Sequence, residues 1–241
     1  MKEQLYTIPV NDAFAIDSEC PVCTMYSSLE KEAIDFTMGP SYMEDDIRME
    51  TNRIGFCSHH VKKLYKHQNR LGLALMLHTH MKRTNEDLEK LLSSSSPAKK
   101  GLFSKKAESS PVTEYIQTLN QSCYICNRID TIFQRYLVTI FYCYEHDSEF
   151  REKFAASKGF CTRHFGMLYD TAPAQLSTKR LNEFIQTLNS VYLSNMKRVT
   201  DDLEWFTDKF DYRNENAPWK NSKDALPRSM TKTNSIPVDE E

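Results

Sequence analysis

The sequence predicts an all-α protein of two repeated helical halves, each with a Cys3His metal knuckle and a long amphipathic helix. Three observations lead to this prediction: motifs that recur in one order, apolar residues at helical spacing, and a Cys-x-x-Cys pair followed by a Cys-x-x-His pair in each half. Because 241 residues with about 40% apolar content can bury a core, we expect folded halves and not a disordered chain.

The repeat is found by laying the chain against itself with an offset of about 103 residues. Residues 20–23 (Cys-Pro-Val-Cys) recur as 123–126 (Cys-Tyr-Ile-Cys), and residues 55–60 (Gly-Phe-Cys-Ser-His-His) recur as 159–164 (Gly-Phe-Cys-Thr-Arg-His). The paired motifs are separated by 33 residues in the first half and by 34 in the second. A shared order and a shared spacing indicate two copies of one helical unit.

The repeat divides the chain into four segments. We place the first zinc-binding repeat at 1–92 and the second at 112–210. Between them, residues 93–111 carry four consecutive serines, two prolines, a glycine and four lysines, so a flexible linker is expected. Residues 211–241 collect Asn, Pro, Lys and acidic side chains, which is typical of a polar C-terminal tail, and Trp219 is expected to dock onto the body.

Apolar residues recur every three or four positions in both halves, as on one face of a helix. The stripes that predict two long helices are Leu64, Leu71, Leu75, His78, Met81, Leu88 and Leu91, and Leu181, Ile185, Leu188, Tyr192, Met196, Val199, Leu203 and Phe206. Residues 27–37 and 129–142 also fit helices, whereas an alternating strand pattern is confined to residues 4–10. A pseudo-twofold relation between the halves is expected.

The cysteines and histidines predict two zinc ions per chain. Tetrahedral zinc is typically held by two short ligand pairs that folding brings together, and each half offers two such pairs. We assign the ligands half by half: Cys20, Cys23, Cys57 and His60 to one ion, and Cys123, Cys126, Cys161 and His164 to the other. His59 competes with His60, but only His60 occupies the position that His164 has in the second copy.

Four protein ligands leave no coordination position for water or substrate, so the predicted sites are structural and not catalytic. Three alternatives remain open: cysteines that are ordinary core side chains, Cys-x-x-Cys pairs that act as redox dithiols, and an iron–sulfur cluster with one histidine ligand. Two copies in matched order favour the metal sites over the first alternative, and the absence of a strand–helix context disfavours the second.

The other reactive residues are interpreted as structural. Cys143 has no counterpart in the first half and is expected to be a buried thiol, with a reactive nucleophile as the alternative. His78 and His80 lie two positions apart on a helix and cannot chelate one ion together. Two acidic clusters could supply general acids or bases but more often cap helices or face solvent: Glu44, Asp45 and Asp46 with Arg48, and Glu145, His146, Asp147 and Glu149 with Arg151.

Composition limits the functional classes further. A formal net charge of −2 and a pI near 6.4 give no strong nucleic-acid signal, and the lysines at 99–106 support only weak, salt-sensitive contact with anions. No stretch approaches the roughly 18 to 20 apolar residues of a membrane span, and residues 1–16 lack the apolar run of a secretory signal. We therefore expect a cytoplasmic protein, in which seven cysteines serve metal binding more naturally than disulfides.

These motifs resemble those of a bacterial family, mostly from Firmicutes, that is grouped as domain of unknown function 6062. The similarity rests on residues 5–14 (Leu-Tyr-Thr-Ile-Pro-Val-Asn-Asp-Ala-Phe), the Glu-Cys-Pro-Val-Cys knuckle at 19–23, both Gly-Phe-Cys-x-x-His blocks, and residues 223–228 (Lys-Asp-Ala-Leu-Pro-Arg). It covers the chain apart from the serine-rich stretch. The resemblance implies a soluble bacterial protein and brings no established activity.

The function expected from these features is that of a non-enzymatic interaction or scaffold protein with an unknown protein partner. Closed metal sites, long amphipathic helices and polar tails suit binding better than turnover. A thiol or zinc redox sensor is the alternative, because the same cysteines could release metal on oxidation. An enzyme that uses the acidic clusters or Cys143 is the third hypothesis.

Overall fold

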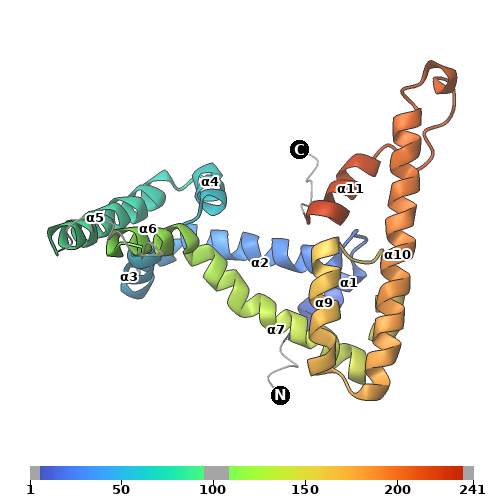
Figure 1. Cartoon of the computed structure of the whole chain (residues 1–241), viewed down its shortest axis with the longest axis horizontal. Coiled ribbons are helices and arrows are strands. Elements are labelled where there is room, and N and C mark those ends of the chain that lie inside the picture. The colour runs from blue at the N-terminus through green and yellow to red at the C-terminus, as the bar shows by residue number, and fades with distance from the viewer. Residues whose placement is uncertain (1–5, 95–108, 236–241) are drawn as a thin grey trace, which may run out of the picture. The chain divides into compact units, whose positions relative to one another are not determined.

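The computed structural model describes residues 6–94 and 109–235, and within these ranges all regular structure is helical (Figure 1). The all-α fold class predicted from the sequence is confirmed. The helices are α1 (Thr7–Ala15), α2 (Pro21–Met38), η2 (Pro40–Met43), α3 (Asp45–Ile54), α4 (Ser58–Lys66), α5 (Arg70–Ser94), α6 (Pro111–Gln121), α7 (Tyr124–His146), α8 (Ser148–Ala156), α9 (Thr162–Gln175), α10 (Thr178–Asp208), η3 (Tyr212–Asn214) and α11 (Ala225–Asn234).

The strand pattern noted at residues 4–10 does not correspond to a strand where the structure describes it. From Thr7 onward this segment belongs to α1, whose buried residues are Val10, Ala13 and Phe14. Their spacing of three and four positions places them on one helical face, and burial of that face outweighs the short alternating pattern. The strand expectation is therefore wrong from Thr7 onward.

The chain forms two compact units that do not coincide with the two repeats in the sequence. Unit 1 comprises Met1–Leu29 and Ile132–Glu241, and unit 2 comprises Glu30–Thr131. The chain passes from unit 1 into unit 2 within α2 and returns to unit 1 within α7. Of the predicted linker at 93–111, residues 95–108 lie outside the described residues, and Pro111 already begins α6.

Unit 1 is built around a cluster of phenylalanine rings. Phe14 of α1 lies with its ring centroid 4.9 Å from Phe150 and 5.7 Å from Phe154, both on α8. Phe154 in turn lies 5.1 Å from Phe160 and 5.2 Å from Phe184 of α10. The last four rings are fully buried, and each contributes roughly 1.5–3 kcal/mol of burial free energy. This cluster fixes the backbone immediately before Cys161.

The C-terminal segment of unit 1 is not the peripheral tail that its polar composition suggests. Helix α11 packs against α9 and α10, and Figure 1 shows it in red beside them. Its Lys232 is buried, and the indole ring of Trp219 lies 5.9 Å from Phe206 near the end of α10. The segment 225–235 is therefore part of the body, held by a few buried contacts that composition does not reveal.

In unit 2, α5 packs against α3, α4 and α6. The apolar stripe predicted from Leu64 to Leu91 is interrupted, because α4 ends at Lys66 and α5 begins at Arg70. Asn69 starts the new helix: its side chain accepts a hydrogen bond from Gly72 N and donates one to Met38 O.

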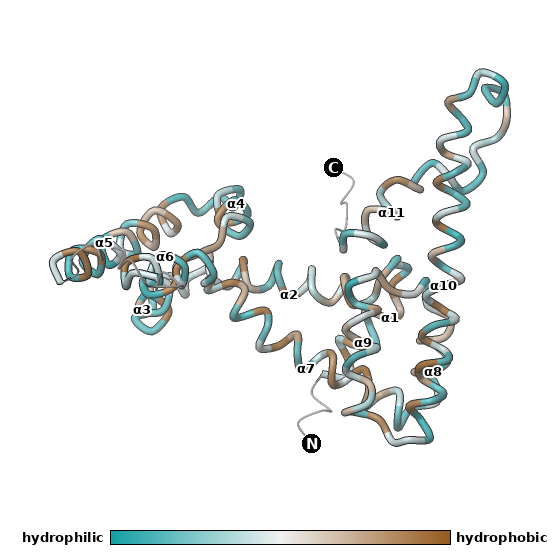
Figure 2. The backbone as a smooth tube through the Cα atoms, in the orientation of Figure 1, coloured by the Kyte–Doolittle hydropathy of each residue, from teal (hydrophilic) through white to brown (hydrophobic). Residues whose placement is uncertain are grey.

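The face that α5 buries also differs from the predicted one. Leu73 and Met76 are buried, whereas Leu71 and Met81, both in the predicted stripe, are more than 60% exposed. Figure 2 shows teal and brown residues alternating along this helix. The spacing of apolar residues therefore predicted that this segment is helical but did not predict which face of α5 packs against the rest of unit 2. In α10, Leu188 and Val199 of the predicted stripe are buried as expected.

Candidate metal centres

Eight donor atoms gather in two groups, each of three cysteine sulfurs and one histidine nitrogen. Site A comprises Cys20, Cys23, Cys161 and His164, and site B comprises Cys57, His60, Cys123 and Cys126. Within each group all donor atoms lie within 4.8 Å of one another. Site A lies wholly in unit 1 and site B wholly in unit 2.

The sequence-based assignment, in which the two motifs of one half bind the same ion, is wrong. Each Cys-x-x-Cys pair meets the Cys-x-x-His pair of the other half, so Cys20 and Cys23 do not share a group with Cys57 and His60. The length of the helices gives the reason. At about 1.5 Å per residue, the part of α2 that follows Cys23 (residues 24–38) carries the chain about 23 Å away from it, and the 10 residues of α3 span only about 15 Å.

In the second half, too, a long helix separates the Cys-x-x-Cys pair from the Cys-x-x-His pair. Helix α7 has 23 residues and spans about 34 Å, whereas α8 has 9 residues and spans about 13 Å. The chain does not return to Cys126 before it reaches Cys161. The helix that follows each cysteine pair was predicted from the sequence, and its length was the signal for the exchanged pairing.

Each Cys-x-x-Cys pair straddles the start of a long helix. Cys20 directly precedes α2 and its carbonyl accepts a hydrogen bond from Thr24 N, while Cys23 lies in the first turn. Cys23 N also lies 3.4 Å from Cys20 Sγ. At a helix N-terminus, free backbone amides and the helix dipole stabilise thiolate charge.

Each Cys-x-x-His pair is placed by a glycine and a helix cap. Gly55 and Gly159 have φ of 63° and 79°, a conformation that suits glycine. A Cβ atom on Gly55 would lie only 2.5 Å from His80 Nε2. Cys57 and Cys161 then occupy the N-cap positions of α4 and α9, and each histidine lies three residues later in the first helical turn.

The donor separations fit one tetrahedral ion per site. With Zn–S near 2.3 Å and Zn–N near 2.0 Å, a tetrahedron has S···S edges of about 3.8 Å and S···N edges of about 3.5 Å. In site A, His164 Nδ1 lies 3.5, 3.4 and 3.2 Å from the sulfurs of Cys20, Cys23 and Cys161, and the last two sulfurs are 3.7 Å apart.

Site B has nearly the same dimensions. His60 Nδ1 lies 3.3, 3.3 and 3.4 Å from the sulfurs of Cys57, Cys123 and Cys126. Three thiolates gathered in so small a volume repel one another, and a divalent cation at their centre would offset that repulsion. The donor sets and their dimensions therefore fit a bound metal ion in both sites.

A buried carboxylate supports the histidine of site B. Glu30 of α2 has an oxygen 3.1 Å from His60 Nε2 and 2.7 Å from His59 Nε2, and its other oxygen accepts a hydrogen bond from Lys63 Nζ at 2.5 Å. Burial alone would raise the pKa of Glu30, but the hydrogen bonds from His60, Lys63 and His59 lower it to about 2. Glu30 is therefore ionised and orients the His60 ring.

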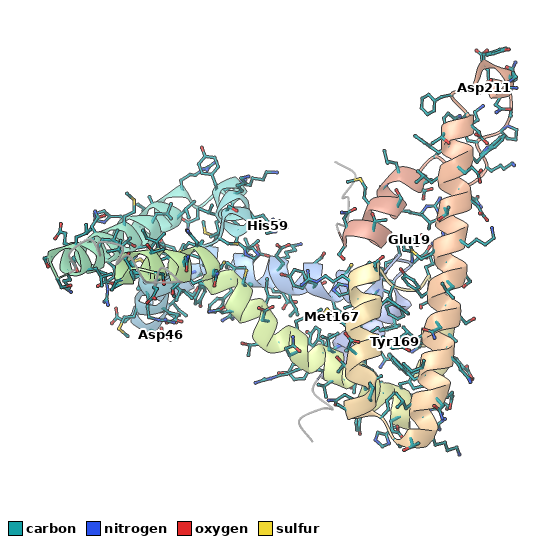
Figure 3. The ribbon with its side chains drawn as sticks, in the orientation of Figure 1. Glu19, Asp46, His59, Met167, Tyr169 and Asp211 are labelled. Carbon is teal, nitrogen blue, oxygen red and sulfur yellow. The ribbon has the colours of Figure 1, made fainter. Side chains whose placement is uncertain are left out.

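His59 lies outside the donor group of site B. Its ring is exposed on α4, as Figure 3 shows, and contacts Glu30 and not the sulfurs. The sequence-based choice of His60 over His59 thus agrees with the geometry. The position that matches Glu30 in the second half is Phe133, whose ring lies 5.8 Å from that of His164. Each histidine thus lies beside three cysteine sulfurs, but His60 is also hydrogen-bonded to a carboxylate whereas His164 lies beside an aromatic ring.

Site A is supported by a buried lysine of α11. Lys232 Nζ donates hydrogen bonds to Glu19 O at 2.7 Å and Lys158 O at 2.5 Å, and it lies 3.2 Å from the Glu19 carboxylate. Burial lowers the pKa of Lys232, and Glu19 counteracts this effect. Arg198 also contacts Glu19, at 2.6 Å, and Figure 3 labels Glu19 close to α11.

The C-terminal residues contact site A directly as well. Ser235 Oγ lies 3.0 Å from Cys161 Sγ, and Thr162 Oγ1 donates to Lys232 O. In site B, the position of Glu19 is taken by Ser122, whose hydroxyl donates to Ile54 O at 2.6 Å. The backbone before the Cys-x-x-Cys pair is thus hydrogen-bonded to Lys232 of α11 in site A, whereas in site B the Ser122 side chain before that pair bonds to the backbone of Ile54.

The two sites differ in exposure. All four ligands of site A are buried, and burial raises the pKa of Cys20 to about 12. In site B, His60 and Cys123 are buried while Cys57 and Cys126 are partly exposed. Burial also acts on Cys123, but hydrogen bonding to His60 outweighs it and lowers its pKa to about 6.

The remaining candidates from the sequence have structural roles. Cys143 is a buried thiol whose pKa burial raises to about 11. His80 Nδ1 lies 2.9 Å from Asn52 O, and His78 is exposed on α5. Neither belongs to a donor group.

The two acidic clusters are used at helix ends and in local contacts. Asp45 and Asp46 form the first turn of α3, whose N-cap is Glu44. Asp147 caps α8 by accepting hydrogen bonds from Glu149 N and Phe150 N. Arg48 and Arg151 donate to nearby backbone carbonyls, and Glu145 accepts from Ser177. The first cluster is exposed at the start of α3, where Glu44 makes no side-chain capping hydrogen bond, and the second caps α8 through Asp147, so both match the expectation of caps or solvent-facing residues.

Glu30 and Lys232 were not recognised from the sequence. Glu30 sits in a charged stretch of α2 that reads as a solvated face, and Lys232 sits in a polar segment. The one signal near Lys232 was the block at 223–228, which the family resemblance had pointed out but which no chemical pattern explained.

None of the helices in the described parts of the chain combines the length and apolar character that a bilayer crossing requires. Comparison with known proteins gives one match. The model of the family described as "Family of unknown function (DUF6062)" matches residues 1–240. No curated protein and no solved structure matches the chain.

Proposed function

Since the chain belongs to the family of unknown function DUF6062, whose description carries no activity, we propose that it is a cytoplasmic interaction or scaffold protein held together by two structural zinc ions. The observation that carries this proposal is the closed donor set of each site. Three sulfurs and one nitrogen complete a tetrahedron, so the ion has no position left for water or substrate.

Zinc fits these sites better than an iron–sulfur cluster. A cluster spreads its protein ligands over several iron atoms with sulfide between them, which holds the ligands further apart. Here the histidine nitrogen lies within 3.5 Å of all three sulfurs in both sites. One small ion that tolerates thiolate and imidazole ligands accounts for these separations.

The proposed interaction role is supported by apolar side chains that project from α5. Met81 and Leu92 are each 63% exposed on a helix whose packed face lies elsewhere. A surface depression on the same helix is lined by Glu86, Glu89, Lys90 and Ser93 and includes neither Cys143 nor the acidic clusters. Exposed apolar surface with a polar rim is typical of sites that bind another protein.

The metal proposal is tested by elemental analysis and native mass spectrometry of the purified chain. We expect two zinc ions per chain and a loss of helical circular dichroism when a strong chelator removes them, because structural zinc binding is coupled to folding. A Cys143→Ser variant is the control and should keep both ions. Iron with visible absorbance, or metal-free protein of unchanged helicity, would contradict the proposal.

The interaction proposal is tested on α5. We expect a Met81→Glu, Leu92→Glu variant to lose proteins that co-purify with the wild-type chain, while a charge-matched Asn85→Glu, Ser94→Glu variant on the same helix retains them. All variants should keep two metal ions. Turnover of a substrate that survives both pairs of changes but is lost on replacing Cys143 or an acidic cluster would favour an enzyme instead.

A redox sensor is the second candidate function, and one observation favours it. Cys57 and Cys126 are partly exposed residues, whereas Cys20, Cys23 and Cys161 are buried. Reagents in solution can reach a metal-bound thiolate only where the sulfur is exposed.

A further inference from the structure

We propose that site B is an oxidative modification site, at which a hydroperoxide joins Cys57 to Cys126 as a disulfide and releases the metal ion, while site A keeps its ion. This inference rests on the proposed metal binding and goes beyond it, because it gives the two sites different chemistry. Two features of the described residues carry it: the exposure of the cysteine residues and the way each site is covered.

Exposure separates the two donor sets. In site A, Cys20, Cys23 and Cys161 are between 0% and 5% exposed, and burial keeps oxidants away from their sulfurs. In site B, Cys57 and Cys126 are both partly exposed. Their sulfurs lie within 4.8 Å of each other, which is close enough for bond formation after a small side-chain rotation.

The residues that cover each site also indicate that site A is the better protected of the two. In site A, Ser235 Oγ lies 3.0 Å from Cys161 Sγ, and Lys232 ties the adjoining backbone to the residue before Cys20. Such an added segment over the metal centre excludes solvent and slows ligand dissociation. In site B, the support comes from Glu30, which contacts His60 on the side of the ring away from the sulfurs. Cys57 and Cys126 remain partly exposed residues.

The reaction balances with a hydroperoxide as the only oxidant. One thiolate attacks hydrogen peroxide, the O–O bond breaks, and the sulfur becomes a sulfenic acid with release of hydroxide. The second thiolate displaces hydroxide from that sulfur and the S–S bond forms. Two sulfurs have then lost two electrons, two hydroxides take two protons to give water, and the ion loses two of its four ligands. A site with only Cys123 and His60 left cannot hold the metal tightly.

The product would keep two chain segments joined. Cys57 directly precedes α4, and Cys126 lies in the first turn of α7. A disulfide between them replaces the metal as the link, so unit 2 would open locally without losing its connection at this point. A thiol reductant would reverse the change.

The test uses the full zinc-loaded chain, hydrogen peroxide in small excess, native mass spectrometry and peptide mapping with thiol alkylation. We expect two ions before oxidation, then a species that has lost one ion and carries a Cys57–Cys126 disulfide, with Cys20, Cys23 and Cys161 protected until denaturation. Loss from site B should be at least about tenfold faster than from site A, in line with thiol exposure. Dithiothreitol and zinc should restore the starting mass.

A Cys57→His variant isolates the oxidised sulfur, because Cys2His2 is also a zinc ligand set. It should keep two ions and release the site B ion about tenfold more slowly under peroxide. Cys143→Ser should behave as the wild type. If Cys57→His does not fold, peptide mapping of the oxidised wild-type chain still shows whether Cys57 and Cys126 form the disulfide.

Other outcomes would overturn the inference. They are equal loss from both sites, earlier loss from site A, retention of both ions under peroxide, or a Cys123–Cys126 disulfide without Cys57. Protein that holds no metal before oxidation would refute the proposed function instead, so the two failures are distinguishable.

Discussion

Sites A and B have the same four donors in the same local geometry, yet their surroundings differ. Site A is buried and is covered by α11, with Lys232 and Glu19 as a buried charged pair. Site B is partly exposed and is supported by Glu30, which contacts His60 of the donor group and the side chains of His59 and Lys63. The comparison teaches that the ligand motif determines whether a metal site forms, while the residues around it determine how accessible the site is.

The largest expected effect comes from removing one ligand at each site. Structural zinc contributes roughly 10–16 kcal/mol of apparent binding free energy, which matches or exceeds the stability of a typical domain. Cys161→Ser should therefore remove amide protection from α9 and α11, and Cys57→Ser from α4, as measured by hydrogen exchange with mass spectrometry. If Cys161→Ser instead exposed the start of α7 around Cys123, the ligands would be paired half by half.

The next largest effect is expected at Lys232. Replacing this buried lysine by methionine leaves part of the Glu19 charge uncompensated, which typically costs about 3 kcal/mol. Urea unfolding followed by tryptophan fluorescence measures it, because Trp205 and Trp219 both lie in unit 1. Lys197→Met is the control: its pair with Asp201 is exposed, so no measurable change in the free energy of unfolding is expected. Equal effects of the two changes would argue against a supporting role for Lys232.

A smaller effect is expected from Glu30→Gln, which removes the carboxylate behind His60. Loss of such a supporting group typically weakens metal affinity by about 10–100-fold, so competition with a chromophoric chelator should show weaker binding at site B alone. Glu32→Gln, an exposed change on the same helix, should leave both affinities unchanged. Weaker binding at site A in the Glu30 variant would mean that the two sites are not independent.

The smallest effect separates the neighbouring histidines. His59 is exposed and is one of three groups that contact Glu30, so His59→Ala should change the affinity of site B by less than about fivefold. His60→Ala should abolish that site, because it removes the nitrogen ligand. Cobalt substitution makes the difference visible, since loss of a ligand changes the d–d spectrum. Similar spectra for His60→Ala and wild type would exclude His60 as a ligand.

The sequence predicted the helical class and the eight residues that gather in sites A and B. Helical class follows from local spacing, and the motif Cys-x-x-Cys or Cys-x-x-His places two donors on one helical turn. The pairing between motifs could not be read in the same way, because it depends on helix length and direction. The lengths of α2 and α7 were the available clue, since the shorter helices after them cannot bring the chain back.

The supporting residues were harder to predict for a physical reason. Lys232 lies 213 residues from Glu19 in the sequence, and a buried ion pair of that range leaves no local pattern. Glu30 looks like any charged residue of an amphipathic helix until His60 is placed beside it. The packed face of α5 was also missed, because Leu71 and Leu73 lie on different sides of the helix and periodicity alone does not rank them.

The crossing of the chain within α2 and α7 has a consequence for its synthesis on the ribosome. Residues 1–92 contain Cys20, Cys23, Cys57 and His60, yet these belong to different donor groups. No group is complete until Cys126 has left the exit tunnel, and site A must wait for His164. The first half of the nascent chain thus emerges with two incomplete donor sets. Site B can bind a metal ion only after Cys126 has emerged and site A only after His164, so neither site can load while the first half alone is outside the ribosome.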